Sequence, residues 1–532
     1  MDTHPLSSSD PSVVRELAET DDRPWFKKPN LRALYMVLLP ACVGAEMTSA
    51  FDTNLMVDLQ ATGSWELFYN SPGPALLGAM TAMYSLGAIL SLAIVPSMVD
   101  RQGRRASIIF GCGLMLIGAT LQGASQNLPM FLSARLILGF GAPFSIVGSA
   151  SLIGELSHPK ERAVMTSLFN GFFGIGTIII AGITLVTYDM QSDWGWRIPS
   201  LLQATPSVMQ LVFILLVPES PRWLLSKGRG AEALAILVKY HGEGDTQSTF
   251  VRAEYADIEK TLRTEMRAGG RGWLELFATP GMRKRAMLAA FLGIAVQWSG
   301  VGLIASYLPR ILDTIGIHEN ITKNRINLAH SCWALLCATT LALTMPRFKR
   351  RTAFLTSTSL TALVMVGWTV AAVEWTETQT RGSAGAVLIF IFLFTPAMSM
   401  GYGVLLYTYL TELFPFHIRA KGIVLYTGFS RTSVFIGQLV NPIGLDNAGW
   451  KYYLIYCIFL SVQVAFIYLT FPETANRTLE ELTFCGFFSL LVLYKLTTGR
   501  KCMKGAVKMW AEGYQGKHRQ RSPRLLRLKP LK

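Results

Sequence analysis

Two ionisable residues stand inside long apolar stretches of this sequence, Asp52 and Arg135. An isolated charge in the hydrocarbon interior of a membrane costs several kcal/mol by insertion scales. Charges in such places therefore pair with one another or take part in the work of the protein. A nearby guanidinium would favour the charged form of the Asp52 carboxyl group. The alternative is a static ion pair that only orients two helices.

Other kinds of chemistry find little support. No glycine-rich phosphate loop precedes a basic helix, and neither the cysteines nor the histidines have the spacing of metal ligands. The sequence therefore predicts no enzyme, no metal site and no cofactor. The seven cysteines are expected to be small buried hydrophobic residues. The cysteines and the histidines considered are Cys42, Cys112, Cys332, Cys337, Cys457, Cys485 and Cys502, and His158, His241, His318, His330 and His417.

The elements that position Asp52 and Arg135 are expected to be membrane-spanning helices. The 532 residues are 51% hydrophobic and only 16% charged, more apolar than one soluble core requires. Apolar stretches of roughly 20 residues recur about twelve times, each long enough to cross a bilayer. The expected spans are 33–56, 75–97, 106–124, 129–151, 165–187, 199–217, 285–309, 327–346, 352–373, 384–408, 422–441 and 451–471.

The formal net charge of +15 lies mainly outside these spans. From Arg500 onward the tail carries many basic residues against Glu512 alone, so membrane lipid rather than nucleic acid is the expected partner. Basic residues also fill the loops after the even-numbered spans, which predicts that these loops and both termini are cytoplasmic. The sequon at Asn320 then falls outside the cell and is predicted to be glycosylated, whereas the sequon at Asn476 falls inside.

The sequence contains an internal repeat. Glu155-x3-Pro159-x2-Arg162 corresponds to Glu412-x2-Pro415-x3-Arg419, and the basic run 100–105 corresponds to 346–351. Two related six-helix halves with a site between them are a common transporter layout. The predicted parts are a cytoplasmic tail 1–32, a bundle 33–217, a central loop 218–284 with short helices, a second bundle 285–471 and a basic tail 472–532.

Several motifs resemble the sugar porter family of the major facilitator superfamily, from about Leu31 to Leu482. The resemblance implies an all-α membrane protein with twelve transmembrane helices in two pseudo-symmetric bundles, which moves a sugar or sugar-like solute by alternating access. The motifs are Asp-Arg-x-Gly-Arg-Arg at 100–105, Arg135 with Gly139 and Gly141, Pro-Glu-Ser-Pro-Arg-Trp-Leu at 218–224, Gln-Trp-Ser-Gly at 297–300, Pro415 with Arg-Ala-Lys-Gly at 419–422, and Pro-Glu-Thr at 472–474.

Within that family the chain resembles the fungal branch of lactose permeases and cellodextrin transporters. Three segments carry this resemblance: 51–56, 196–203 and 441–450. A fungal plasma membrane, a monomer and proton symport are implied. Proton-coupled members of the family have an Asp and an Arg at positions 52 and 135. The resemblance thus favours proton uptake by Asp52, with release from Arg135 coupled to the outward or inward state.

The resemblance also implies a network of ion pairs that latches the cytoplasmic helix ends when the carrier faces outward. The second half departs from the family pattern, with Pro346 and Lys349 in place of Asp and Gly, so its latch is expected to be weaker. A solvated loop face is the plainer alternative. The implied members are Asp100, Arg104, Arg105, Glu155 and Arg162 in the first half, and Arg350, Glu412 and Arg419 in the second.

Sugar recognition needs amides and hydroxyls that match a ring of hydroxyl groups, with an aromatic side chain against the C–H face. By resemblance, the sugar-contacting positions are held by Asn170, Gln297 and Tyr407. Trp298 and Tyr307 are weaker candidates, as is Phe51. Ordinary helix packing is the alternative for each aromatic residue, and a hydrogen bond between helices is the alternative for Gln297.

Some positions depart from the family. Val296, Val301 and Ser306 replace residues that would hydrogen-bond to sugar, which weakens the case for a simple hexose. Arg431 stands in the eleventh span, where a cation facing inward would favour a carboxylated or otherwise anionic solute. Alternatively Arg431 snorkels to the headgroups or pairs structurally.

Two other functions stay open. The first is transport of a non-sugar, possibly anionic, metabolite. The second is a sugar sensor that does not transport, although the tail here is short and basic. The apolar segment 483–496 is too short to span a membrane and is expected either at the interface or as an error of gene prediction.

Overall fold

The computed structural model describes residue 17 and residues 23–190, 192–268, 273–344, 348–414 and 418–473. The sequon at Asn476, the segment 483–496, Pro346 and Pro415 lie outside the described residues. Within the described ranges the regular structure is entirely helical, as predicted. Eleven of these helical stretches are long and apolar enough to cross a membrane.

The first bundle follows the expected spans except at the second and the sixth. The expected span 75–97 is interrupted, since α4 ends at Ser91 and α5 begins at Val95. Residues 199–217 were expected to form one long helix, but two shorter helices, α9 and α10, cover this region. Neither helix alone is long enough to cross a membrane, which explains why eleven rather than twelve membrane-crossing helices are found in the described residues. After the short turn η1 (Trp25–Lys27), the helices are α2 (Pro29–Leu59), α3 (Gly63–Phe68), α4 (Pro74–Ser91), α5 (Val95–Gln102), α6 (Arg104–Gly123), α7 (Leu128–Leu156), α8 (Arg162–Thr187), α9 (Trp194–Leu202) and α10 (Thr205–Ile214).

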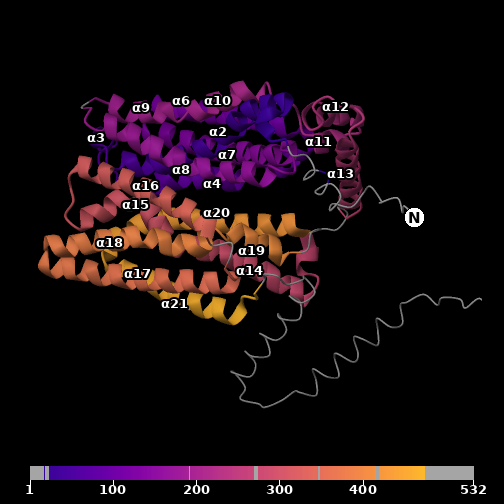
Figure 1. The fold of residues 1–532 in the computed structure, drawn as a ribbon. Helices are drawn as coiled ribbons and strands as arrows, with labels where there is room; N and C mark the ends of the chain where they lie inside the picture. The colour runs from indigo at the N-terminus through magenta and orange to yellow at the C-terminus, as the bar shows by residue number, and fades with distance from the viewer. Residues whose placement is uncertain are drawn as a thin grey trace, which may run out of the picture.

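Three helices between the bundles form a compact insert at one end of the molecule: α11 (Pro221–Ser226), α12 (Gly230–Tyr240) and α13 (Thr249–Ala268). Figure 1 shows them at the right-hand end, and we call this end the insert end and the opposite one the far end. The insert is attached to the start of α2. Both carboxylate oxygens of Glu243 accept hydrogen bonds there, from the backbone N–H groups of Asn30 and Leu31 at 3.0 and 2.9 Å. A carboxylate at this place also complements the positive end of the helix dipole.

The second bundle repeats the first, with two of its spans interrupted. The turn η2 (Trp273–Phe277) leads into α14 (Pro280–Gln297), and α15 (Val301–Thr314) completes that span. The tenth expected span consists of α18, a π-helical turn η4 and α19. The remaining bounds are α16 (Asn320–Thr344), α17 (Arg350–Thr378), α18 (Arg381–Met398), η4 (Ser399–Gly403), α19 (Leu406–Leu413), α20 (Arg419–Ala448) and α21 (Lys451–Thr470).

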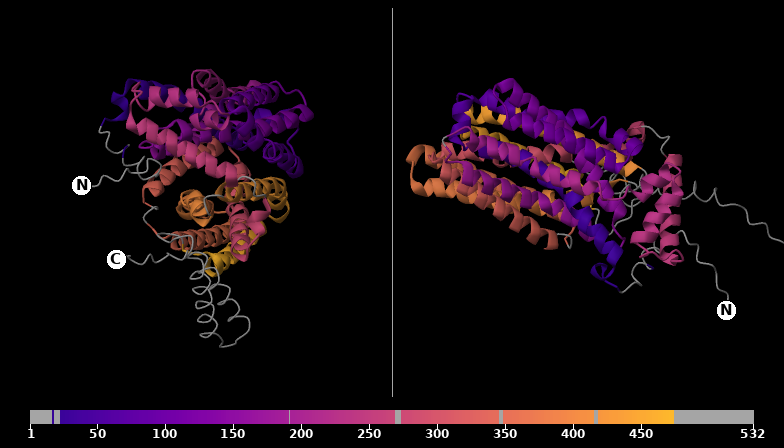
Figure 2. Two further views of the ribbon diagram at one scale, coloured as in Figure 1. Left: turned by 90° about the vertical axis from the view of Figure 1, so that its right-hand side faces the viewer. Right: turned by 90° about the horizontal axis from the view of Figure 1, so that it is seen from above.

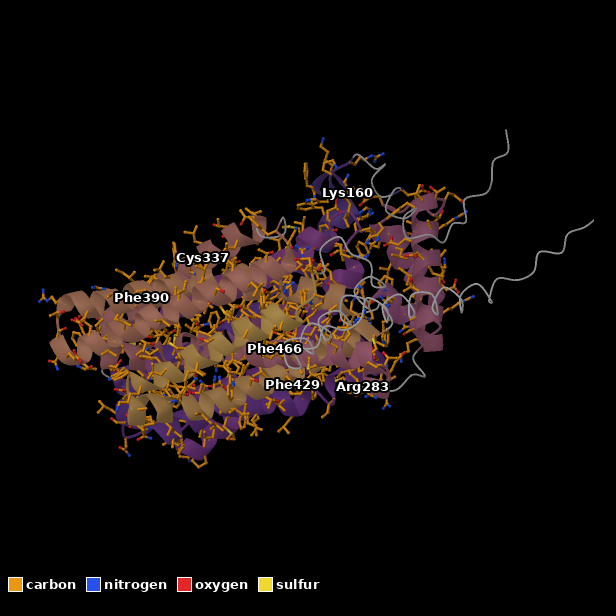
Figure 3. The ribbon with its side chains drawn as sticks, turned by 90° about the horizontal axis from the view of Figure 1, so that it is seen from below. Lys160, Arg283, Cys337, Phe390, Phe429 and Phe466 are labelled. Atoms are coloured by element: carbon orange, nitrogen blue, oxygen red, sulfur yellow. The ribbon has the colours of Figure 1, made fainter. Side chains whose placement is uncertain are left out.

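The two bundles lie side by side as two layers, indigo to magenta above and orange to yellow below in Figure 1. Contacts of α4 with α20, α8 with α16 and α2 with α15 join the layers. In Figure 2 the insert again lies at one end of both layers. Figure 3 shows Lys160 and Arg283 near that end and Phe390 toward the far end.

The breaks in the second bundle have backbone causes. Gly300 lies between α14 and α15 with φ of 103°, a conformation that glycine adopts without steric cost. Tyr307 has non-helical backbone angles two residues before Pro309, whose ring and missing N–H disturb the preceding turn. Broken helices near the membrane centre free backbone groups beside a binding site, a common device in transporters.

A very close approach of α4 to α7 places Arg135 near Tyr84. A Cβ atom on Gly139 would lie 1.9 Å from the carbonyl oxygen of Tyr84, and one on Gly87 would lie 2.2 Å from that of Leu136. Only glycine permits this separation, since both obstacles are backbone atoms of a packed helix. Small residues at such crossings are typical of membrane helices.

We therefore expect Gly139→Val to destabilise the first bundle by more than about 2 kcal/mol, because α4 and α7 must separate. Thermal melting of the detergent-purified protein measures the effect. Gly154→Ala in the same helix is the matched control, since no heavy atom lies within 4 Å of its added Cβ. Equal melting temperatures for the two variants would contradict the proposed packing.

Candidate functional site

A cavity of about 600 Å³ lies between the two bundles. Its wall takes residues from α2, α4 and α7 of the first bundle and from α14, α15, α20 and α21 of the second. The volume falls in the range of small-molecule sites. The polar and charged residues of the wall are Thr53, Thr81, Tyr84, Ser85, Arg135, Gln297, Trp298, Ser306, Arg431, Ser433, Gln438, Asn441, Tyr452 and Tyr456.

Asp52 and Arg135 are neighbours, but their side chains do not form a close ion pair in this conformation. Arg135 Nη1 donates to the backbone carbonyl of Asp52 at 3.0 Å, and its guanidinium lies 5.2 Å from the centre of the Tyr84 ring. Both residues are almost fully buried. Neither carboxylate oxygen of Asp52 has a hydrogen-bond partner among the described residues. The guanidinium of Arg135 and the hydroxyl of Tyr84 nevertheless lie close enough to interact electrostatically with the Asp52 carboxyl group.

Three of the six predicted substrate-binding residues line the cavity: Gln297, Trp298 and Arg431. Gln297 Nε2 donates to the hydroxyl of Ser430 at 3.2 Å, so the amide bridges α14 and α20. Trp298 is 38% exposed, with its ring 5.7 Å from that of Phe459, which leaves a free aromatic surface beside the polar groups.

The other three lie elsewhere. Asn170 donates to the carbonyl of Thr166 one turn back in its own helix, at 3.1 Å. Tyr307 is fully buried at the kink of α15, and its hydroxyl donates to the carbonyl of Gln438 at 2.6 Å. Tyr407 is 59% exposed and packs against the ring of Tyr426. In this conformation none of these three residues forms part of the cavity wall.

The sequence analysis missed several polar residues of the wall. Gln438 and Asn441 stand three residues apart in α20, on one face of the helix. Gln438 accepts a hydrogen bond from Ser85 of α4 at 2.6 Å, which joins the bundles. Asn441 accepts from the hydroxyls of Tyr452 and Tyr456. The three-residue spacing of two amides in an apolar helix was the available signal.

At the insert end, Arg104 and Glu155 form a bidentate pair, with two N–O distances of 3.0 Å. Glu155 also accepts a hydrogen bond from the hydroxyl of Ser220. The neighbouring carboxylate of Glu219 accepts from the backbone N–H groups of Arg104 and Arg105 at the start of α6, both at 3.2 Å. These contacts tie α6, α7 and α11 together within the first bundle.

The second bundle repeats this arrangement with poorer geometry. Arg350 donates to Glu412 at 3.2 and 3.4 Å through one carboxylate oxygen, whereas the first pair uses both. Glu473 accepts from the backbone N–H groups of Arg350 and Arg351 at the start of α17, in the manner of Glu219. The motifs of the internal repeat therefore make equivalent contacts in the two halves.

The remaining predicted network residues make different contacts. The backbone carbonyl of Asp100 accepts from the indole N–H of Trp223 at 3.1 Å. Arg105 donates to the carbonyl of Leu215 at 3.1 Å, and Arg162 donates to that of Ser157 at 3.4 Å. Arg419 is the first residue of α20. The structure thus forms two Arg–Glu pairs and gives Asp100, Arg105 and Arg162 other partners.

The bundles are joined directly at the far end. Gln60 of α2 donates to the carbonyl of Ser306 at 2.9 Å, and Arg310 of α15 donates to that of Pro72 at 3.2 Å. Asn327 of α16 donates to the buried carboxylate of Asp58. Toward the insert end Tyr407 is largely exposed, although it interacts electrostatically with Glu46 of the opposite bundle. In this conformation the bundles are therefore in direct contact at the far end, and Tyr407 is exposed toward the insert end.

A buried ion pair within the insert positions His241 for a hydrogen bond to the first bundle. His241 Nδ1 contacts Glu254 at 2.7 Å, and His241 Nε2 contacts the carbonyl of Leu156 at 3.2 Å. Burial opposes the charge on His241, but the Glu254 carboxylate and the two hydrogen bonds raise its pKa. Burial likewise opposes the charge on Glu254, whose pKa is lowered by His241 and also by Arg162 and His158.

We expect docking of the insert to weaken at alkaline pH. The contribution of His241 is complete below its ordinary pKa of 6.5 and is lost as the pH rises through the raised value. That of Glu254 is complete above 4.5 and is lost as the pH falls through the lowered value. Amide hydrogen exchange in α13, corrected for intrinsic rates, should therefore be slowest between the lowered pKa of Glu254 and the raised pKa of His241. His241→Gln should abolish the increase in hydrogen exchange at alkaline pH. An unchanged increase in this variant would contradict the role given to His241.

Comparison with known proteins gives consistent results. A family profile described as "Sugar (and other) transporter" matches residues 51–484. The chain is 26% identical to a high-affinity glucose transporter of Kluyveromyces lactis, over 86% of both chains. It is 27% identical to the arabinose-proton symporter of Bacillus subtilis, over 77% of this chain and 87% of the symporter.

The fold is similar to that of the xylose transporter XylE from E. coli in its inward open conformation. The TM-score is 0.70 at 21% identity, covering 85% of this chain and all of that one. XylE is described as a proton:xylose symporter of the major facilitator superfamily.

Proposed function

Because the chain belongs to the sugar transporter family of the major facilitator superfamily, we propose that it carries a sugar or sugar-like solute across a membrane in symport with protons. The observation that carries this proposal is the cavity between the two bundles, with hydrogen-bonding groups from both bundles in its wall and a buried Asp–Arg neighbourhood beside it. A site shared between two rigid bodies can be exposed to either side by rocking one against the other.

The solute would bind to the amides of Gln297, Gln438 and Asn441, with Trp298 against its apolar face. These groups line the cavity and can match hydroxyls as donors or acceptors. Asn441 already accepts two tyrosine hydroxyls, which leaves its amide N–H groups for the solute. The exposed face of Trp298 suits the C–H side of a sugar ring.

Asp52 would be the proton carrier. Its carboxylate oxygens are unpartnered in the described structure, and the guanidinium of Arg135 is held close by the backbone carbonyl of Asp52 itself. A small rotation of Arg135 would bring the guanidinium to the carboxylate and stabilise the charged form. Proton uptake would free Arg135 again, and this exchange of partners would bias the state of the carrier.

The Arg104–Glu155 and Arg350–Glu412 pairs would keep the insert end of each bundle rigid while the bundles move. Each pair lies within one bundle, beside a carboxylate that binds the first N–H groups of a helix. Because these contacts do not cross between the bundles, they can persist in both states. The direct contacts at the far end, by contrast, must break for the carrier to open there.

The insert end is proposed to face the cytoplasm of a fungal cell, with the plasma membrane as the location. Lys160 and Arg283, which belong to two of the loops after even-numbered spans, lie near this end in Figure 3, as the positive-inside rule requires of a cytoplasmic face. The direct contacts between the bundles at the far end would then lie on the outer side of the membrane.

Glycosylation tests this orientation. Asn320 begins α16 at the far end, with its amide 3.6 Å from the position of a Cβ on Gly63. We expect the protein expressed in yeast to lose the mass of one glycan on endoglycosidase treatment, and Asn320→Gln to abolish that change. A sugar chain that survives Asn320→Gln, or a glycan on Asn476, would reverse the proposed orientation.

Asp52→Asn should separate transport from accumulation. One proton moved through about 100 mV supplies about 2.3 kcal/mol, enough for roughly fortyfold accumulation. The variant should still equilibrate labelled glucose across the membrane but no longer concentrate it, because the amide takes up no proton. The measurement is uptake in transport-deficient yeast with and without a protonophore.

Asp58→Asn is the matched control for that experiment. Asp58 is a second fully buried carboxyl in α2, but it contacts Asn327 at the far end and not Arg135. Protonophore-sensitive accumulation should survive in this variant. If accumulation survived in the Asp52 variant as well, the coupling role of Asp52 would be refuted.

A further inference from the structure

Arg431 is a cation in the cavity wall without a close partner. It lies in the middle of α20, twelve residues from Arg419 and so about 18 Å along the helix axis, too deep to snorkel to the headgroups. It lines the cavity between the bundles, and none of the described residues forms a hydrogen bond or close ion pair with it. Its neighbour Ser430 accepts the hydrogen bond from Gln297.

The carboxylate with which Arg431 interacts electrostatically belongs to the other bundle. Glu46 of α2 interacts electrostatically with Arg431. The hydroxyl groups of Tyr84, Tyr407 and Tyr426 do so as well. Glu46 and Arg431 do not come within ion-pair distance here, although both are described. Because the two residues belong to different bundles, rocking of one bundle against the other must change the distance between them. Glu46 cannot therefore neutralise Arg431 throughout a transport cycle.

We propose that Arg431, which lines the cavity deep in α20, binds the carboxylate of a sugar acid. This proposal rests on the proposed sugar transport and specifies the class of solute. Arginine presents a planar pair of donors that matches a carboxylate, and such charge-assisted bonds are stronger than neutral ones. Gln297, Ser433 and Asn441 line the same cavity and supply groups for the hydroxyls.

Substitutions of Glu46 and Arg431 should change the affinity for the acid in opposite directions if Arg431 recognises the solute, but not if the two residues form a gate. If a solute carboxylate binds at Arg431, then removing the Glu46 charge should strengthen binding of the acid, because an anion that interacts with the same guanidinium at longer range is gone. Removing the Arg431 charge should weaken it. If the two residues only closed a gate together, both substitutions would impair transport of acidic and neutral sugars alike.

The experiment compares D-galacturonate with D-galactose, which differ only in the carboxylate. Uptake of both labelled compounds is measured in transport-deficient yeast for wild type, Arg431→Gln, Arg431→Lys and Glu46→Gln, with surface levels matched by a fluorescent fusion. We expect wild type to take up galacturonate. Arg431→Gln should raise its KM about ten- to hundredfold with little change for galactose, since a charge-assisted bond is lost.

Arg431→Lys should keep part of the galacturonate uptake, and Glu46→Gln should lower the KM for galacturonate. Galactose uptake by wild type without any uptake or inhibition by galacturonate would overturn the proposal while leaving sugar transport intact. Parallel loss of both sugars in Arg431→Gln and Glu46→Gln would also overturn it, in favour of a gate. Failure of both sugars in wild type, with or without the protonophore, would refute the sugar acid and the proposed transport together.

Thermal melting of the purified protein tests the same proposal for variants that are poorly delivered to the cell surface. The detergent-purified wild type should melt at a higher temperature with galacturonate than with galactose at equal concentration, by preferential binding to the folded state. Arg431→Gln should lose this difference and Glu46→Gln should enlarge it. Equal shifts for the two ligands in wild type would contradict recognition of the carboxylate.

Discussion

The cost of placing a charge in a low-dielectric interior is the constraint on which the rest of this structure depends. Asp52 and Arg135 are almost completely buried, and several kcal/mol would be lost if either remained charged without compensation. The chain keeps them adjacent through a very close approach of α4 and α7 and an anchoring hydrogen bond from Arg135 to the backbone. That bond positions the guanidinium without engaging the carboxylate. Both groups can therefore exchange partners, which a closed buried ion pair resists.

Rigid bundles are the second requirement, because a rocking movement is useful only if each half moves as one body. Glu219 and Glu473 each bind two free N–H groups at the start of a helix, and a nearby Arg–Glu pair holds the next helix. The breaks at Gly300 and around η4 concentrate irregular backbone in the second bundle, near the cavity. Stiffness is thus placed at the insert end and local adaptability beside the binding site.

Much of this arrangement follows from the sequence, since hydropathy fixes the spans and the repeated motifs fix the contacts at the insert end. Arg104 with Glu155 and Arg350 with Glu412 could be predicted because motif and repeat agreed. The rotation of each helix could not, because nearly uniform apolar stretches carry little information about which face meets the cavity. Asn170 and Tyr307 were misplaced for this reason, and Gln438 was missed. Hydropathy alone also could not predict the interruption between α9 and α10, because the residues on both sides of it are apolar.

The two charge pairs differ in a way that bears on coupling. Asp52 and Arg135 belong to one bundle, so rocking alone does not separate them, whereas Glu46 and Arg431 belong to different bundles. The proposed proton uptake by Asp52 would therefore have to act on the second bundle through groups that interact with both bundles. Tyr84 is such a group: Arg135 lies over its ring, and it interacts electrostatically with both Asp52 and Arg431. The adjacent Ser85 donates to Gln438 across the boundary. Residues 84 and 85 of α4 thus lie between the neighbourhood of Asp52 and Arg135 and the polar face of α20 that lines the cavity.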